Sequence, residues 1–320
     1  MFNKAKKLIN ESKTIYIVGH ANPDGDSIGS AFAMYFALKN MDKDVNVLMT
    51  KCGTRFDFLG YLNEAKKSVE VKSYDLLICV DASDTDRLDI SEEDYLKAKK
   101  VLVIDHHVKK PMKADVLVIE TEAPATAQIV YNLLTTQKMV IDKNIAECIY
   151  LGLLTDTGSF NYQRTTSKTM KIAAEMMDKG IDFARICKKV NDTVKESKLK
   201  LITLGIKNME KYIDGKIRYT QVEKKDLDRL GVELEDADGV TNYLRMIDGT
   251  KVSIYVRGTG NGEYKVSMRS DGYVDISGIC IGFGGGGHVR AAGFSIHKGH
   301  LKKAKEEMLK VIGDVLSKWK

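Results

Sequence analysis

The chain has 320 residues, of which 43% are hydrophobic and 29% charged, and a net charge of +6. This composition is typical of a globular protein long enough for two domains, and no apolar run approaches the roughly 20 residues that span a bilayer. The small positive charge is compatible with anionic substrates, and it is too weak to indicate binding along a long nucleic acid.

The five cysteines indicate a reducing compartment. They are scattered and odd in number, and no CxxC pair occurs (Cys52, Cys79, Cys148, Cys187 and Cys280). This pattern argues against a disulfide framework and against a zinc–thiolate site. The N-terminal stretch MFNKAKKLINESK predicts a short amphipathic helix and has no apolar core or cleavage site of a signal peptide. We therefore expect a cytoplasmic protein without a membrane partner.

The stretch from Thr14 to Ser30 predicts a strand, a polar turn and a helix. The apolar run Thr14–Gly19 predicts a buried strand, and His20 opens a turn that contains Pro23 and Gly25. Ser27 is the predicted N-cap of the helix that follows. In open α/β sheets, ligands bind where a strand's carboxyl end meets a helix start. A polar turn with capping aspartates and a surface histidine explains the same residues.

Further strands of this half also end in ionisable residues. The chain continues with predicted strands at Val45–Met49, Tyr74–Val80, Val101–Ile104 and Asp115–Ile119. Strands that alternate with helices predict a mostly parallel sheet. Three strand ends would then bring acids and histidines to one edge of that sheet, in the groups His20/Asp24/Asp26, Asp81, and Asp105/His106/His107.

The pattern becomes helical from Ala123 to about Lys189, and a polar turn containing Asp156 follows the second of these helices. A long helix is predicted over Val194–Tyr212, and the domain boundary is placed at its end. Beyond Gly215 the pattern indicates antiparallel strands at 217–222, 250–256, 263–268 and 291–296, a helix at 274–283 and a terminal helix at 301–319.

The candidate ligands on the sheet edge suffice for two divalent cations that share one carboxylate. They are His20, Asp24, Asp26, Asp81, His106 and Asp156. Asp81 is the expected bridge because it stands alone at the end of a central strand. Two cations about 3.5–4 Å apart can clamp the attacking and leaving oxygens of a phosphoryl group. A set of carboxylates and imidazoles without thiolate favours Mn²⁺ or Mg²⁺.

Two neighbouring residues are expected to assist. Asp105 precedes the paired histidines and is expected to orient an imidazole. His107 is expected to face the substrate, as a phosphate contact or a proton donor.

Four segments of the N-terminal half, HANPDGDSIGS, VDASD, IDHH and TDTGSF, together resemble the motifs of the DHH phosphoesterase family. The C-terminal RSDG and GGGGHVRAAG resemble that family's DHHA1 substrate-binding domain, and motif spacing is most similar to the bacterial nanoRNase and 3′-phosphoadenosine-5′-phosphate (pAp) phosphatase branch. The resemblance implies an α/β fold with a mostly parallel DHH domain (1–190), a helical linker (191–214) and a smaller α/β DHHA1 domain (215–320).

The resemblance also implies the division of the ligands. His20, Asp24 and Asp81 would hold one Mn²⁺, and Asp26, Asp81, His106 and Asp156 the other, with Mg²⁺ or Co²⁺ as alternative metals. His107 would contact the scissile phosphate, with Asp81 and Asp105 as its catalytic partners.

The C-terminal glycine run supports an interpretation that does not depend on the resemblance. Successive glycines can point backbone N–H groups at an anion, and a guanidinium can bind a phosphate in a fork. A flexible loop explains a lone glycine run equally well. With the resemblance, the run implies a clamp for the far end of the substrate, made of Arg269, Ser270, Gly285, Gly286, Gly287 and His288.

The expected activity is hydrolysis of short oligoribonucleotides to mononucleotides, and of pAp to AMP. An enzyme for linear or cyclic dinucleotide messengers, such as pApA or cyclic di-AMP, is the alternative that the motifs leave open. A manganese pyrophosphatase is disfavoured by the clamp motifs, and a non-catalytic nucleotide sensor by the complete ligand set. No stable protein partner is implied, and a homodimer stays open.

Overall fold

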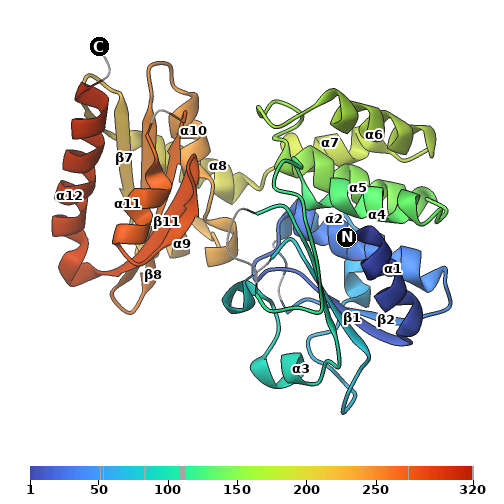
Figure 1. Cartoon of the computed structure of the whole chain (residues 1–320). Coiled ribbons are helices and arrows are strands. Elements are labelled where there is room, and N and C mark those ends of the chain that lie inside the picture. The colour runs from blue at the N-terminus through green and yellow to red at the C-terminus, as the bar shows by residue number, and fades with distance from the viewer. Residues whose placement is uncertain (51, 53, 83, 108–111, 273, 319–320) are drawn as a thin grey trace. The chain divides into compact units, whose positions relative to one another are not determined.

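A computed structural model describes residues 1–50, 52, 54–82, 84–107, 112–272 and 274–318 (Figure 1). The chain forms two compact units, unit 1 (Met1–Thr193) and unit 2 (Val194–Lys320). Among the described residues, no helix is both long and apolar enough to cross a membrane.

Unit 1 is built on a five-stranded parallel sheet with the strand order β2-β1-β3-β4-β5. The predicted strands lie within two residues of the observed ones, which are β1 (Thr14–Val18), β2 (Asp44–Leu48), β3 (Leu76–Val80), β4 (Val101–Asp105) and β5 (Val116–Ile119). The helices of this unit are α1 (Phe2–Glu11), α2 (Gly25–Lys39), α3 (Glu92–Leu96), α4 (Thr126–Thr136), α5 (Lys143–Asp156), α6 (Ser167–Asp178) and α7 (Phe183–Asn191).

Both faces of this sheet are buried. Successive strand residues point to opposite sides of the sheet, and the residues on each side belong to a buried core. Ile15 and Ile17 belong to a large core shared with α2, α4 and α5, whereas Tyr16 and Val18 belong to a smaller core on the other face. This double burial explains why the strands read as continuous apolar runs in the sequence.

Glycines let α2 and α5 pack closely above the sheet. A Cβ on Gly29 would lie 2.3 Å from the carbonyl oxygen of Cys148 and 3.0 Å from the backbone nitrogen of Gly152. A Cβ on Gly152 would in turn lie 2.8 Å from a carboxylate oxygen of Asp26. The small residues therefore bring the helix that carries Asp26 against the helix that ends at Asp156.

Two predicted details of unit 1 are wrong. The N-cap of α2 is Asp24, not Ser27, because the Asp24 carboxylate accepts hydrogen bonds from the backbone N–H groups of Asp26 and Ser27 at 3.0 and 3.1 Å. Asp156 is the last residue of α5 rather than part of a turn, because the helix continues one more half-turn than its apolar spacing suggested.

Unit 2 contains a six-stranded sheet with the order β10-β11-β9-β8-β7-β6. Its strands are β6 (Glu210–Tyr212), β7 (Ile217–Val222), β8 (Val252–Gly260), β9 (Glu263–Ser270), β10 (Gly286–His288) and β11 (Ala291–His297). Its helices are α8 (Glu196–Lys207), α9 (Lys224–Leu230), α10 (Val240–Met246), α11 (Ile276–Gly282) and α12 (Lys298–Ser317). Helices α11 and α12 share a core with one face of the sheet, and α8, α9 and α10 with the other.

Three predictions for unit 2 need correction. The helix predicted over Val194–Tyr212 ends at Lys207, because the chain then forms β6, which pairs with β7. Strands β7 and β8 are parallel, since α9 and α10 form a crossover between them that is too short to show in the sequence pattern. The terminal helix begins at Lys298, three residues earlier than predicted, and its predicted end at Trp319 lies outside the described residues.

Substituting Gly29 with alanine tests the close packing of α2 and α5. We expect the Gly29→Ala variant to lose about 1–3 kcal/mol of unfolding free energy, because its Cβ meets helix backbone that cannot rotate away. Denaturant unfolding measures this loss, with Gly60→Ala as the control because a Cβ there would meet nothing within 4 Å. Equal stabilities of the two variants would contradict the packing account.

Candidate metal centre

The carboxyl ends of three adjacent strands supply the centre of the site. His20 follows β1, Asp81 follows β3, and His106 follows β4, with β1 next to β3 and β3 next to β4. From β1 the chain passes to β2, which lies on one side of β1, and then to β3, which lies on the other side of β1. This reversal is the topological switch point at which open α/β sheets bind ligands.

Two imidazoles present the same nitrogen to this site. Nδ1 of His20 lies 3.0 Å from the carbonyl oxygen of Ala21, and Nδ1 of His106 lies 3.1 Å from that of Ala123. A carbonyl accepts only, so each Nδ1 carries the proton and donates it. Each Nε2 is left with a lone pair that faces the carboxylates. This orientation, with Nδ1 bound to a carbonyl and Nε2 free of a proton, is the one that metal-binding histidines have.

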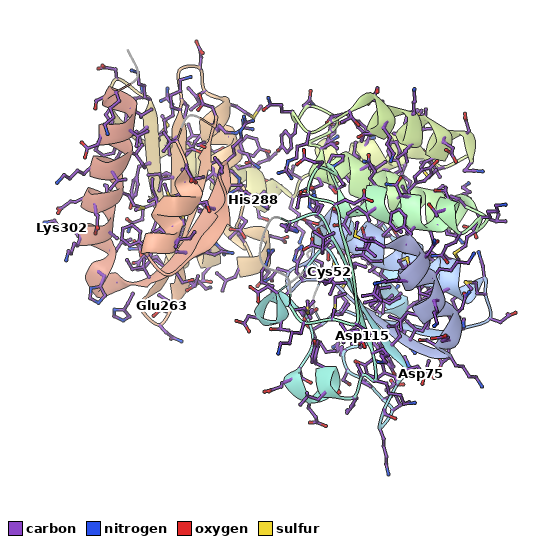
Figure 2. All side chains as sticks on the ribbon, in the orientation of Figure 1. Cys52, Asp75, Asp115, Glu263, His288 and Lys302 are labelled. Carbon is purple, nitrogen blue, oxygen red and sulfur yellow. The ribbon has the colours of Figure 1, made fainter. Side chains whose placement is uncertain are left out.

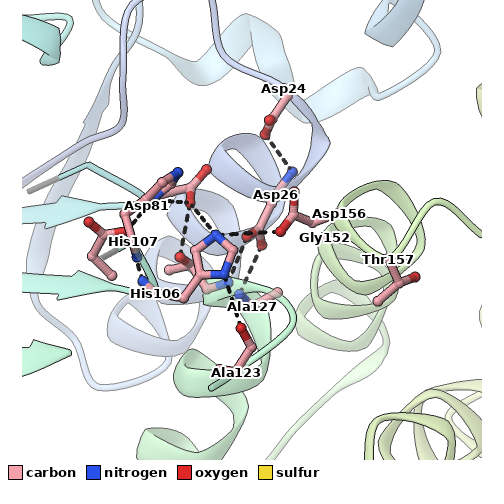
Figure 3. A network of polar contacts seen from close by, with 12 residues as sticks. Asp24, Asp26, Asp81, His106, His107, Ala123, Ala127, Gly152, Asp156 and Thr157 are labelled. Carbon is pink, nitrogen blue, oxygen red and sulfur yellow. Dashed lines mark hydrogen bonds and ion pairs between the residues drawn. The ribbon is translucent and has the colours of Figure 1, made fainter. Parts of the chain in front are cut away.

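Asp81 lies close to both imidazoles, and Figure 3 shows it beside His106. One of its oxygens lies 3.5 Å from Nε2 of His20, and the other lies 3.6 Å from Nε2 of His106. Its side chain is buried, and its backbone has a left-handed φ of 56°, a conformation that a non-glycine residue adopts at some energetic cost. The geometry thus turns the two carboxylate oxygens of Asp81 toward different histidines.

Asp26 is fully buried and is fixed by the start of α4. Its carboxylate accepts hydrogen bonds from the backbone N–H groups of Thr126 at 2.6 Å and Ala127 at 2.9 Å. These N–H groups belong to the first turn of the helix, where the helix dipole also favours negative charge. Segments one hundred residues apart are therefore joined at the site.

Asp156 and Asp24 complete the group. A carboxylate oxygen of Asp156 lies 3.4 Å from Nε2 of His106, and one of Asp24 lies 3.9 Å from Nε2 of His20. Asp24 is more than half exposed, whereas Asp156 is one-third exposed. The site therefore opens to solvent on the side of these two residues.

Burial and mutual repulsion shift the pKa values of the site. Burial, followed by repulsion from the other aspartates, holds the pKa values of Asp26 and Asp81 well above the usual range. The same causes raise the pKa of Asp156 to about 7. Burial, followed by the neighbouring His107, lowers the pKa of His106 to about 4. His106 is therefore neutral at pH 7, as a metal ligand must be.

These donors fit divalent cations. The ligand atoms of His20, Asp24 and Asp81 lie within 4.8 Å of one another, and so do those of Asp26, His106 and Asp156. Atoms that both bind one ion at about 2.0–2.2 Å lie about 3–3.5 Å apart, close to the separations observed here. Carboxylate oxygens beside imidazole lone pairs repel each other without a cation between them. All six predicted ligands are thus together, and their roles as ligands remain a prediction.

Asp105 and His107 form a separate pair at the edge of the centre. The fully buried Asp105 carboxylate lies 2.6 Å from Nδ1 of His107 and accepts the backbone N–H groups of His106 and His107. The same His107 nitrogen lies 3.7 Å from Asp81. Asp105 therefore fixes the orientation of the His107 ring.

Thr126 is a residue of the site that the sequence analysis missed. Its hydroxyl donates a hydrogen bond of 3.0 Å to Asp81, while its backbone N–H binds Asp26. Ala123 and Gly152 were missed as well, since one acts through its carbonyl and the other by being small. The stretch APATA, a small-residue turn ahead of an apolar helix, was the available signal.

The predicted clamp residues of unit 2 have varied surroundings. Gly286, Gly287 and His288 form the edge strand β10, so their N–H groups alternate in direction. The sequence analysis predicted instead that successive N–H groups point at one anion. Ser270 is buried, and its hydroxyl lies 2.8 Å from the carbonyl oxygen of Val274 and 3.3 Å from that of Val289.

The other predicted clamp residues are Arg269, His288 and Gly285. Arg269 is half-buried and donates to the carbonyl of Met268 at 2.9 Å, whereas His288 is exposed. A Cβ on Gly285 would lie 2.2 Å from the carbonyl oxygen of Gly293, so this glycine is required for packing on β11.

Two family models match the chain. Residues 14–153 match the N-terminal domain of the DHH family, and residues 214–318 match the DHHA1 domain. The two matches fall within units 1 and 2, respectively.

Individual relatives match over almost the whole chain. A bifunctional oligoribonuclease and PAP phosphatase NrnA from Thermus thermophilus is 30% identical over 95% of this chain and 90% of its own. A cyclic-di-AMP phosphodiesterase GdpP from Geobacillus thermodenitrificans is 24% identical over 97% of this chain, which spans 48% of that protein. The crystal structure of an exopolyphosphatase-related protein from Bacteroides fragilis superimposes with a TM-score of 0.89, at 26% identity, over 99% of this chain and 97% of that one.

Metal affinity should depend on pH near neutrality. Because the pKa of Asp156 is raised to about 7, this carboxyl is mostly protonated at pH 6 and must lose its proton when a cation binds. We expect the affinity for Mn²⁺ to rise at least about tenfold from pH 6 to pH 7.5, because Asp156 loses its proton over this range, while His106, with a pKa of about 4, stays neutral throughout.

Calorimetry in two buffers of different ionisation enthalpy measures both the affinity and the protons released. The Asp156→Asn variant is the control, and its affinity should be weaker and less dependent on pH. Equal affinities of the natural chain at the two pH values, without proton release, would contradict the assignment.

Removing the Thr126 hydroxyl tests its support of Asp81. We expect the Thr126→Val variant, which keeps the side-chain shape, to bind Mn²⁺ about 10–100-fold more weakly, because Asp81 loses a hydrogen bond that orients it. The control is Thr135→Val at the far end of the same helix, whose hydroxyl donates to the carbonyl of Tyr131. An unchanged affinity in the Thr126 variant would show that Asp81 needs no such support.

Proposed function

The chain belongs to the DHH family of phosphoesterases and carries a DHHA1 domain, and we propose that it hydrolyses short oligoribonucleotides to mononucleotides and pAp to AMP. The observation that carries this proposal is the orientation of Asp81, whose two oxygens face the lone pairs of His20 and His106. An NrnA at 30% identity over nearly the full length supports the choice of substrates.

Two cations would occupy this site in our proposal. His20, Asp24 and Asp81 would hold one, and Asp26, Asp81, His106 and Asp156 the other. When bound, the pair supplies an activated nucleophile and positive charge near the attacking and leaving oxygens of an in-line displacement at phosphorus. Donors of oxygen and nitrogen only, without thiolate, favour Mn²⁺, with Mg²⁺ or Co²⁺ as substitutes.

The residues of the chain then have separate tasks. The carboxylate of Asp105 keeps the proton of His107 on Nδ1 and holds the ring, which directs the other nitrogen to the substrate. His107 contacts the scissile phosphate and, with both ring nitrogens protonated, gives the proton of Nε2 to the leaving oxygen as the P–O bond breaks, while the proton on Nδ1 stays with Asp105. Asp26, held by the start of α4, keeps its orientation through the reaction because two backbone N–H groups bind it.

Unit 2 is proposed to bind the far end of the substrate. Arg269 and His288 supply cationic or donor groups, and the edge strand Gly286–His288 supplies outward N–H groups. In this proposal Ser270 and Gly285 shape the clamp rather than touch the substrate, because the hydroxyl of Ser270 is bound by the turn. Binding of both ends would limit the substrate to a few nucleotides.

Replacing Asp81 with asparagine tests the proposed bridge. Asparagine tolerates the left-handed backbone and keeps an acceptor for Thr126, so the change removes mainly the charge. We expect Asp81→Asn to reduce hydrolysis of a diadenylate with Mn²⁺ by more than about 100-fold. The control is Asp42→Asn, an exposed aspartate with the nearly equal φ of 55°. Activity of Asp81→Asn within tenfold of this control would refute the bridge.

A panel of substrates separates the proposed activity from the messenger alternative. The alternative is supported by the match to a cyclic-di-AMP phosphodiesterase. We expect kcat/KM to be higher for a linear dinucleotide, a pentanucleotide and pAp than for cyclic di-AMP, because the proposed clamp binds a free end. A preference for cyclic di-AMP would favour the messenger enzyme instead.

A further inference from the structure

A cavity of about 780 Å³ lies in unit 2 at the end of the strands opposite to the predicted clamp. It is lined by residues of β7 and β9 and by the first turns of α9 and α12. Along β9, Tyr264 in the cavity wall is about 17 Å from Arg269 at roughly 3.4 Å per residue. Figure 2 shows Glu263 and His288 at opposite ends of this sheet. The cavity, called the basic pocket below, is therefore distinct from the clamp.

Lysines at helix starts surround the basic pocket. Lys298 is the first residue of α12 and Lys302 lies one turn further on, while Lys224 and Lys225 are the first two residues of α9. A helix start favours negative side chains because the helix dipole is positive there. Helix α12 has 20 residues and no acid in its first turn. The lysines at these helix starts are therefore electrostatically unfavourable, and residues with such an unfavourable placement are often found at functional sites.

Acidic residues do not neutralise the pocket. Glu223 is the single acid among the described residues of its wall, and its carboxylate accepts the hydroxyl of Tyr264 at 2.6 Å and the amide of Gln221 at 2.7 Å. Two of the wall lysines have partners, since Glu210 binds Lys305 at 2.8 Å and Asp228 binds Lys224.

The remaining wall lysines keep their charge unpaired. No ion pair reaches Lys225, Lys298 or Lys302 from the part of the chain that the structure describes. These three charges come from two helices and surround one concavity, whose floor is closed by the buried Tyr219 and Tyr264. Among the described wall residues, three lysines without an ion pair therefore stand against one carboxylate, that of Glu223, and the pocket keeps a net positive charge.

We propose that the basic pocket binds a small molecule that carries a polyphosphate group. Lysine ammonium groups bind phosphate oxygens as point charges, and several such charges from two directions match a chain of phosphates better than a single phosphate. The volume is that of a small-molecule site, and the lysines converge rather than follow a track, which disfavours a nucleic-acid strand. Inorganic polyphosphate and nucleoside triphosphates share this chemistry. The proposal does not depend on the activity of unit 1.

Binding of tripolyphosphate and of ATP to the full-length chain tests the proposal. Calorimetry and thermal unfolding are carried out with EDTA, so that no cation recruits phosphate to the metal centre. The pocket variant is Lys298→Gln with Lys302→Gln. The control is Lys303→Gln with Lys310→Gln, which removes two exposed lysines of α12 that do not line the pocket.

We expect the pocket variant to bind tripolyphosphate at least about tenfold more weakly than the natural chain, and the control to bind within twofold. Without ligand, the pocket variant should unfold at a higher temperature, because it lacks positive charge at a helix start. Tighter binding of ATP than of tripolyphosphate would identify a nucleoside ligand, and equal binding the polyphosphate group alone. No binding to the natural chain, or equal binding to the pocket variant, would overturn the proposal.

Discussion

The structure of unit 1 depends on one electrostatic constraint. The carboxylates of Asp26 and Asp81 are buried, and Asp156 is mostly buried. Asp81 faces the imidazole lone pairs of both His20 and His106, while Asp26 and Asp156 lie beside His106. Such a cluster of acceptors is costly in a site of low dielectric, unless protons or cations neutralise it. Protons neutralise the cluster by binding to the aspartates, whose pKa values are raised for this reason. Divalent cations neutralise it as well, and they also supply the positive charge that phosphoryl transfer requires. The cost of assembling the cluster is therefore also the source of its affinity for metal.

The rest of the unit keeps these groups in place while they repel one another. The start of α4 binds Asp26 through backbone N–H groups, the hydroxyl of Thr126 binds Asp81, and carbonyl groups fix both imidazole tautomers. Close approach of α2, α4 and α5 is possible because Gly29 and Gly152 have no Cβ. The core beneath is apolar and packed on both faces of the sheet, so it resists the relaxation that repulsion would otherwise cause.

Much of this arrangement could be predicted from the sequence, because parallel strands end at one edge of a sheet and strand-end residues must meet there. The five strands of unit 1 and the meeting of His20, Asp81 and His106 follow from that rule. The Thr126 hydroxyl and the role of Gly152 could not be predicted, since each depends on which distant segments pack together. The Asp24 cap is local, but Asp24 and Ser27 both suit an N-cap in the same turn, and the pattern does not decide between them. In unit 2 the short helices α9 and α10 have too few residues to show a clear helical periodicity of apolar positions. The sequence pattern therefore predicts antiparallel strands where β7 and β8 are in fact parallel.

The most direct test of the account is anomalous diffraction from crystals of the protein grown with Mn²⁺. We expect two manganese peaks about 3.5–4 Å apart, one beside His20 and one beside His106, with one oxygen of Asp81 on each ion. A single ion, an ion elsewhere, or two ions that Asp81 does not join would contradict it.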